Sequence, residues 1–136
     1  MSAITITAAN VVPVAGAEID KSRNAGATIT AGQPVYLDET TNTYKLSDAN
    51  LSAAASVVAG IALNGASAGQ PLAVLTGGSI TIGATLVKGT IYVLGATAGD
   101  IVPAADLTTG WYRSIIGVAT TTAILAVKIF NSGVTD

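Results

Sequence analysis

The chain has 136 residues and a mass of 13.4 kDa, the size of a single domain. Half of its residues are hydrophobic but only 10% are charged, against about 25% in ordinary soluble proteins. The absence of His and Cys excludes disulfides, thiolate chemistry, the usual zinc ligands and the commonest general base. The net charge is −2, and the six Lys and Arg residues are scattered. A basic stripe is therefore missing, and we expect no nucleic-acid partner.

Residues 1–25 are expected to form an N-terminal arm that leads into a folded body over residues 26–136. Residues 4–7 alternate apolar and polar side chains, so that Ile4 and Ile6 share one face and suit the open edge of a sheet. Pro13 then ends strand pairing, because it has no N–H and holds the preceding residue extended. The arm would contact a partner or a second copy through Ile4, Ile6, Val11 and Val12. The alternative is that residues 3–7 are the first strand of the protein's own barrel.

No segment of the chain has the pattern of a targeting or membrane-spanning sequence. Residues 1–12 lack the basic start and continuous apolar stretch of a signal peptide. The most apolar run, residues 114–130, is interrupted by threonines and Lys128. We therefore expect synthesis in a cytoplasm and no membrane partner.

Strand signals dominate the rest of the chain and predict an all-β fold. Short runs rich in Val, Ile, Thr and Tyr alternate with Gly, Asn, Asp and Pro, as in small barrels and sandwiches. The predicted strands are residues 4–7, 28–30, 34–38, 43–45, 57–63, 72–75, 79–82, 91–94, 114–119 and 124–130. Residues 48–56 are the one helical candidate, a short alanine-rich segment that Asp48 could cap.

An internal repeat divides the body into two related halves, residues 26–75 and 83–128. GATITAGQPVYL, from Gly26, matches GATLVKGTIYVL, from Gly83, and the distance along the chain between these two glycines defines the repeat offset. Further matches follow in the same order, SVVAGIA with SIIGVA and LAVL with LAVK. Two such modules cannot each bury a face alone, so we expect them to close on one another in a barrel or sandwich with the same strand order in each half.

No residue pattern indicates catalysis, and the chain is expected to be neither an enzyme nor a cofactor- or metal-binding protein. Asp38 and Glu39 are adjacent, so on a strand they would point to opposite faces, and they suit a solvated hairpin loop better than an acid–base pair. Gly77 and Gly78 lack the spacing and lysine of a phosphate-binding loop and are expected to form a hairpin turn.

Two further features indicate protein contacts. The chain has no ionisable residue from Ala49 through Val87, which predicts strands that are buried on both faces or covered in an assembly. Trp111 and Tyr112 either begin a strand with one ring in the core or form an exposed contact patch. We therefore expect a homo-oligomer.

Several phrases of the body resemble a group of tailed-bacteriophage head-decoration, or capsid-cement, proteins. The phrases are GATITAGQPVYLDETTNTYKLSDA, SVVAGIALNGASAGQPLAVLTGGSITIGA, GTIYVLGATAGDIVPAADLTTGWYRSIIGVATT and the ending NSGV. The resemblance implies a β-barrel or β-tulip-like body on the capsid surface of a virion. It also implies the major capsid protein as partner, with neighbouring capsid subunits clamped by homotrimers or, less favoured, dimers. A tail-fibre or baseplate module and a carbohydrate-binding or adhesin domain are the alternatives.

Overall fold

The computed structural model describes residues 3–135, and over these residues the expected all-β fold is confirmed. The strands are β1 Val12–Pro13, β2 Glu18–Asn24, β3 Pro34–Asp38, β4 Thr43–Leu46, β5 Gly60–Ala62, β6 Pro71–Thr81, β7 Ile91–Leu94, β8 Ile101–Pro103, β9 Tyr112–Ala119 and β10 Ile124–Thr135. Two single-turn 3₁₀ helices, η1 Ala8–Asn10 and η2 Ala104–Asp106, are the helices of these residues, and neither has the length to cross a membrane. The helix expected over residues 48–56 is wrong, because this segment forms a series of turns.

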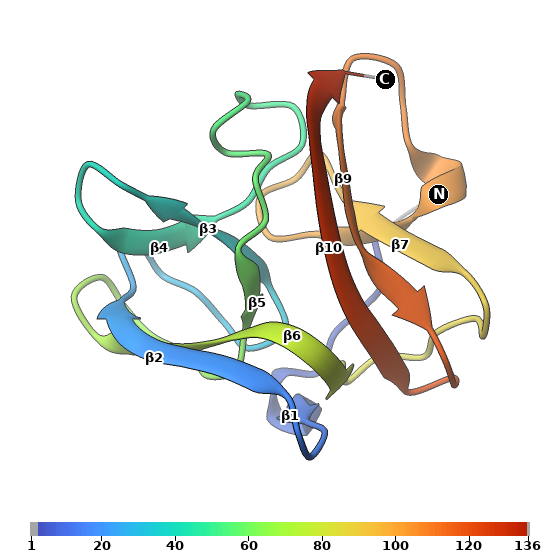
Figure 1. The fold of residues 1–136 in the computed structure, drawn as a ribbon, viewed down its shortest axis with the longest axis horizontal. Coiled ribbons are helices and arrows are strands. Elements are labelled where there is room, and N and C mark those ends of the chain that lie inside the picture. Colours follow the sequence, from blue (N-terminus) through green and yellow to red (C-terminus); the bar gives the residue numbers. More distant parts are fainter. Residues whose placement is uncertain (1–2, 136) are drawn as a thin grey trace.

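The strands form one curled sheet in the order β4-β3-β5-β6-β10-β9-β7-β8, and all named strand pairs are antiparallel. Strands β1 and β2 pair with β6 outside this path. Figure 1 shows β2 to β6 on one side of the molecule and β7, β9 and β10 on the other. From the central pair outward, equivalent strands follow in the same order, β6-β5-β3-β4 in the first half and β10-β9-β7-β8 in the second. The two halves therefore meet where β6 pairs with β10.

The two halves have the same strand registers, as expected of related modules. Val35 pairs with Leu46 in the first half and Tyr92 with Pro103 in the second, with both partners shifted by the repeat offset. The pairing of β3 with β5 and of β7 with β9 follows the same rule. Loop bonds repeat as well, since Gly32 N–H donates to the Ala62 carbonyl and Gly89 N–H to the Ala119 carbonyl.

The last hairpin of each half corrects the sequence alignment by two positions. Ala62 pairs with Val74 in the first half, and Ala119 pairs with Leu125 in the second. The sequence match aligns Val74 with Val127, whereas the strand pairing makes Leu125 the equivalent of Val74. Because side chains alternate with a period of two, an error of two positions leaves every side chain on its predicted face.

The buried residues also correspond between the halves. The smaller core lies inside the first half and includes Val35, Tyr44 and Val74. The residues at the equivalent places of the second half are Tyr92, Ile101 and Leu125, and they belong to the larger core. The larger core additionally holds Ile61, Leu75 and others from the first half, so it joins the two modules.

Strand β6 replaces the hairpin expected at Gly77 and Gly78. One strand runs from Pro71 to Thr81, pairing with β5 and β2 over its first part and with β10 and β1 over its second. Gly78 has φ +94°, and a Cβ there would lie 2.8 Å from Ala17 Cα. The glycines therefore permit a bend and a close backbone approach within a strand.

Other local predictions were wrong because the strand signals were misleading or weak. The expected strand over residues 28–30 is reduced to an isolated bridge between Ile29 and Ala66, and residues 4–7 form no strand. Strands β2 and β8 were missed, because the charges of EIDKSRN and the shortness of IVP give weak strand signals. Strand β1 was missed as well, because Pro13 was expected to end strand pairing, whereas it pairs with Ile80.

The N-terminal region lies against the body instead of leaving it as an arm. Strand β2 pairs with the first part of β6, and β1 pairs with its last residues, so most of residues 12–24 belong to the sheet. Ile4 and Ile6 pack against the larger core. In this chain, burial of these two side chains holds the segment in place.

Candidate interaction surfaces

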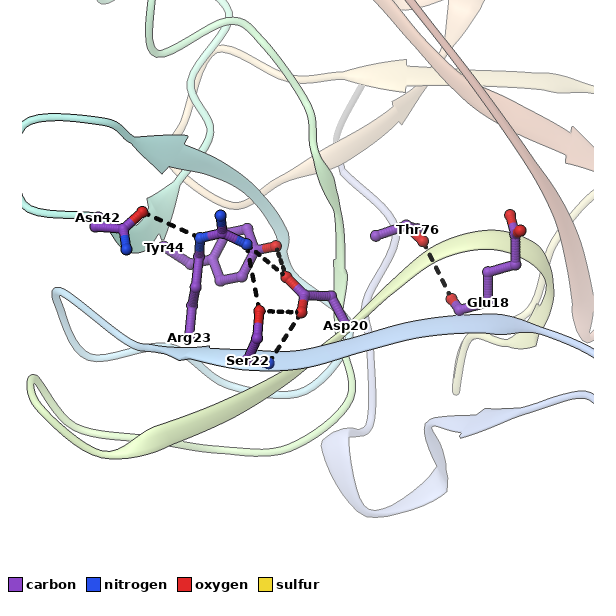
Figure 2. A network of polar contacts seen from close by, with 7 residues as sticks. All are labelled: Glu18, Asp20, Ser22, Arg23, Asn42, Tyr44 and Thr76. Atoms are coloured by element: carbon purple, nitrogen blue, oxygen red, sulfur yellow. Dashed lines mark hydrogen bonds and ion pairs between the residues drawn. The ribbon is translucent and has the colours of Figure 1, made fainter.

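The first half is closed by a polar clasp, which we define as Asp20, Ser22, Arg23, Asn42 and Tyr44 (Figure 2). Tyr44 Oη donates to Asp20 Oδ2 at 2.6 Å, and Arg23 Nη1 lies 3.2 Å from the same oxygen. Arg23 Nε donates to Asn42 Oδ1 at 3.2 Å. These bonds join β2 to β4 and the β3–β4 loop, and the Gly26 N–H completes the closure by donating to the Tyr44 carbonyl at 2.7 Å.

The clasp shifts the protonation of its two central groups in opposite directions. Hydrogen bonds from the Ser22 hydroxyl and then from Tyr44 hold the pKa of Asp20 well below its usual range. Burial, followed by the hydrogen bond to Asp20, raises the pKa of Tyr44 to about 12. Both shifts favour the neutral phenol bound to a carboxylate. The Asp20–Tyr44 pair is therefore a structural connection that does not titrate near neutral pH.

The second half is closed by the N-terminal segment instead. Ile101 and Gly83 are the equivalents of Tyr44 and Gly26 in the second half, but no backbone hydrogen bond joins them directly. Ile4 N–H donates to the Ile101 carbonyl at 3.0 Å, and Thr7 N–H donates to the Gly83 carbonyl at 2.8 Å. Residues 4–7 thus bridge the gap, which we call the seam.

The predicted interface residues of the N-terminal region differ in their surroundings. Ile4 and Ile6 are half-buried against the core, Val11 is buried, and Val12 is 53% exposed. Ile6 lies so close to Gly32 that a Cβ there would be 2.6 Å from Ile6 Cγ2. Of these four residues, Val12 is the most exposed in the single chain.

Spaces remain on both flanks of the segment. A cavity of about 170 Å³ is lined by Ile4 and Ile6 together with residues of the 30–33 and 99–101 loops. A more open hollow of about 390 Å³ lies beside Thr5 and Thr7 and reaches Gly83 and Thr85. Residues 4–7 therefore have open space on both flanks, although Ile6 packs closely against Gly32.

Trp111 and Tyr112 lie at the start of β9, at the edge of the core. The Trp111 side chain is half-buried and packs against the larger core, and the half-buried Tyr112 donates its N–H to the Ala49 carbonyl at 2.7 Å. This placement agrees with the first of the two alternatives, in which one ring starts a strand against the core.

Sequence reasoning missed an apolar surface on strands β7, β9 and β10. Directly opposed residues of antiparallel strands share a face, and two such rows lie side by side here. The rows are Ile91, Val118 and Ala126, and Val93, Ile115 and Phe130. We call these six residues the outer face, because the opposite side of the same strands carries core residues such as Tyr92, Leu125 and Val127; within the outer face, Val93 is buried.

Part of the outer face is open to solvent. Phe130 is 62% exposed and Ile91 is 46% exposed, while Ile115, Val118 and Ala126 are half-buried. The charged residues of β9 and β10 are both basic, Arg113 and Lys128, and both are exposed. The sequence signal for this surface was the alternation of residues 124–130. Leu125, Val127 and Ile129 point inward, so Phe130 points outward.

Ionisable groups outside the clasp form no metal site. Among residues 3–135, no group of three or more potential ligand side chains could hold a metal. Asp38, the last residue of β3, accepts from Lys45 Nζ at 2.7 Å across the β3–β4 hairpin, and Glu39 follows it as an exposed residue of the loop. Burial, followed by repulsion from Asp48, raises the pKa of Asp100.

Neither a scan of protein-family models nor a search of curated proteins finds a match for this chain. The assignment of a function therefore depends on the surfaces described above and on the phrases quoted from the sequence.

Proposed function

We propose that the protein is a structural component of a bacteriophage virion that binds the outside of the capsid and clamps neighbouring capsid subunits. The observation that carries the proposal is the outer face of β7, β9 and β10. Exposed apolar side chains that lie together on one surface are typical of protein contacts, since a soluble protein otherwise covers them. The resemblance of the sequence phrases to head-decoration proteins directs this contact to the major capsid protein.

The chemistry of the outer face indicates what its partner must supply. Phe130 and Ile91 would be the anchors, because large side chains that lose their water on binding contribute most of the affinity at interfaces. Lys128 is exposed between Ala126 and Phe130 on β10, so a complementary surface would place a carboxylate beside the apolar anchors. With a charged share of only 10%, many copies can pack on one lattice with little mutual repulsion.

Attachment to a lattice also supports a small body of this kind. Partners that bind only the folded state stabilise it by mass action. A homo-oligomer, with a trimer favoured over a dimer by the resemblance, would present several outer faces at once and gain avidity across neighbouring capsid subunits.

Binding to capsids tests the proposal. Heads of the encoding phage, assembled without this protein, are mixed with purified protein, and the bound fraction is measured by sedimentation. The wild-type protein is expected to bind at saturable sites. The double variant Phe130→Ser, Ile91→Ser is expected to bind about tenfold or more weakly, because it removes the apolar anchors.

Leu51→Ser is the matched control, since Leu51 is 72% exposed and lies outside the outer face. Its binding is expected to stay within about twofold of wild type. A wild-type protein that does not bind heads would refute the capsid role, and equal losses in the Leu51 and outer-face variants would refute the assignment of the surface.

A further inference from the structure

The two halves close in different ways although their registers are the same. In the first half, Gly26 N–H reaches the Tyr44 carbonyl directly, and Asp20 and Tyr44 reinforce the connection. In the second half, the residue equivalent to Tyr44 is Ile101. The residue equivalent to Asp20 is Ile80, because Ile80 pairs with Leu125 as Asp20 pairs with Val74, and Leu125 and Val74 occupy equivalent positions. Both partners of the polar bond are therefore replaced by isoleucine, and the chain cannot close the second half in the same manner.

The seam has the features of a strand-acceptor site. Its two backbone carbonyls, at Ile101 and Gly83, accept the N–H groups of Ile4 and Thr7. Ile80 and Ile101 belong to the core against which Ile4 and Ile6 pack. The site therefore recognises a short extended segment with apolar side chains at alternate positions, through backbone bonds and apolar contacts together.

A hinge separates the inserted segment from the rest of the chain. The three residues of helix η1, Ala8–Asn10, are all exposed, and the helix has no side-chain cap. After it, the chain is firmly attached again, because Val11 is buried, β1 pairs with β6, and Val14 N–H donates to the Ser79 carbonyl at 2.9 Å. Straightening this exposed turn would release residues 4–7 while residues 11–14 stay attached to the body.

We propose that the seam is a strand-acceptor site that, in the assembled oligomer, receives residues 4–7 of a neighbouring copy. The backbone bonds and apolar contacts are the same whether the segment comes from its own chain or from a neighbour, so exchange needs only a change at the hinge. The open hollow beside Thr5 and Thr7 leaves these two residues exposed to solvent, so a segment from outside can approach the seam along this flank. Copies held side by side raise the local concentration of the neighbour's segment.

This inference rests on the oligomer of the proposed function but not on capsid binding, and cysteine cross-linking tests it separately. The chain contains no cysteine, so introduced thiols are the sole reactive ones. Thr7→Cys and Thr85→Cys place thiols at two exposed residues that line the same hollow. The two single variants are mixed, unfolded, refolded together and treated with a short bis-maleimide.

Exchange predicts a covalent pair that contains one chain of each variant, recovered from the oligomer fraction. Thr40→Cys, in the exposed β3–β4 loop, replaces Thr85→Cys in the control mixture and is expected to give only background cross-linking. The doubly substituted chain reports the alternative directly. Internal cross-links alone at every protein concentration, with no mixed pair, would overturn the exchange, whereas loss of capsid binding with mixed pairs intact would overturn only the proposed function.

Discussion

The hydroxyl of Tyr44 donates to Asp20 Oδ2 at 2.6 Å and thereby connects β4 to β2, two strands that are not neighbours in the sheet. In the second half, Ile101 takes the place of Tyr44 and the N-terminal segment supplies the connection. One repeated scaffold is thus closed once by side-chain hydrogen bonds and once by an added segment. The first closure depends on pH, and the second depends on the N-terminus.

Replacing Tyr44 with phenylalanine is expected to lower the free energy of unfolding at neutral pH by about 1 kcal/mol, the contribution of one hydrogen bond. It should also change the pH dependence. Tyr44 has a pKa of about 12 in the folded protein against an ordinary value of 10.0, so its contribution is complete below pH 10 and is lost as pH rises from 10 to about 12. Asp20 has a lowered pKa, so its contribution is present above about pH 4 and is lost as pH falls below that value.

Urea unfolding at a series of pH values measures both effects. In Tyr44→Phe, the loss of stability at alkaline pH that is attributed to Tyr44 should disappear. Part of the loss of stability at acid pH should remain, since Ser22 and Arg23 still bind Asp20. Tyr36→Phe, at a tyrosine of β3 outside the clasp, is the control. If Tyr44→Phe lost as much stability as the wild type between pH 10 and about 12, the assignment of this loss to Tyr44 would be contradicted.

Gly60→Ala is expected to destabilise the protein by about 2–3 kcal/mol, because a Cβ at this position collides with the Leu75 carbonyl oxygen of the paired strand. Gly117, its equivalent in the second half, meets the Ala126 carbonyl oxygen in the same way and should respond alike. Gly65→Ala is the matched control with only an ordinary contact at 3.8 Å, and a change within about 0.5 kcal/mol is expected. Thermal unfolding of the three variants measures the difference, and equal stability of all three would show that the strands separate easily.

Asn131→Ala is expected to lower stability by about 1–3 kcal/mol, the cost of leaving buried hydrogen-bonding groups without partners. The Asn131 amide pairs with both backbone groups of Val58, accepting from its N–H at 2.8 Å and donating to its carbonyl at 3.1 Å. Truncation removes both of these bonds. Asn50→Ala, at an exposed asparagine, serves as the control in the same denaturation experiment. A loss no larger than that of Asn50→Ala would mean that water replaces the amide at no cost.

Much of the fold could be predicted because it depends on local signals. Strands β3 and β7 were predicted with their observed bounds, since the phrases PVYL and IYVL combine β-branched and aromatic residues between clear turn residues. The repeat itself then predicts that the two hairpins share one register. What failed was the interpretation of glycine, because Gly77 and Gly78 look the same in a hairpin turn and in a bent strand, and only the strands that pair with β6 on each side distinguish them.

The candidate surfaces were less predictable, because each depends on which segments the fold brings together. Asp20 and Tyr44 are far apart in sequence and neither belongs to a motif. Phe130 was expected within a strand, but its exposure is set by the register of β10 against β9. The alternation of Ile4 and Ile6 predicted a strand, but residues 4–7 form none, and the two side chains instead pack against the larger core of the chain's own body.

Deleting residues 2–7 is the change that separates a free arm from a closing element. A free arm could be removed without loss of stability, whereas here the deletion should lower the melting temperature, because Ile4 and Ile6 cover the larger core and the Ile101 and Gly83 carbonyls lose their donors. A loss of about 2–3 kcal/mol is expected from two half-buried isoleucines and two backbone bonds. Calorimetry of the truncated protein checks this, with Thr5→Ala as the control at an exposed residue of the same segment.

Addition of a peptide with the sequence of residues 2–10 should restore the melting temperature in a concentration-dependent manner, since a ligand that binds only the folded state stabilises it. An unchanged melting temperature after truncation would mean that the second half is closed without its N-terminal segment.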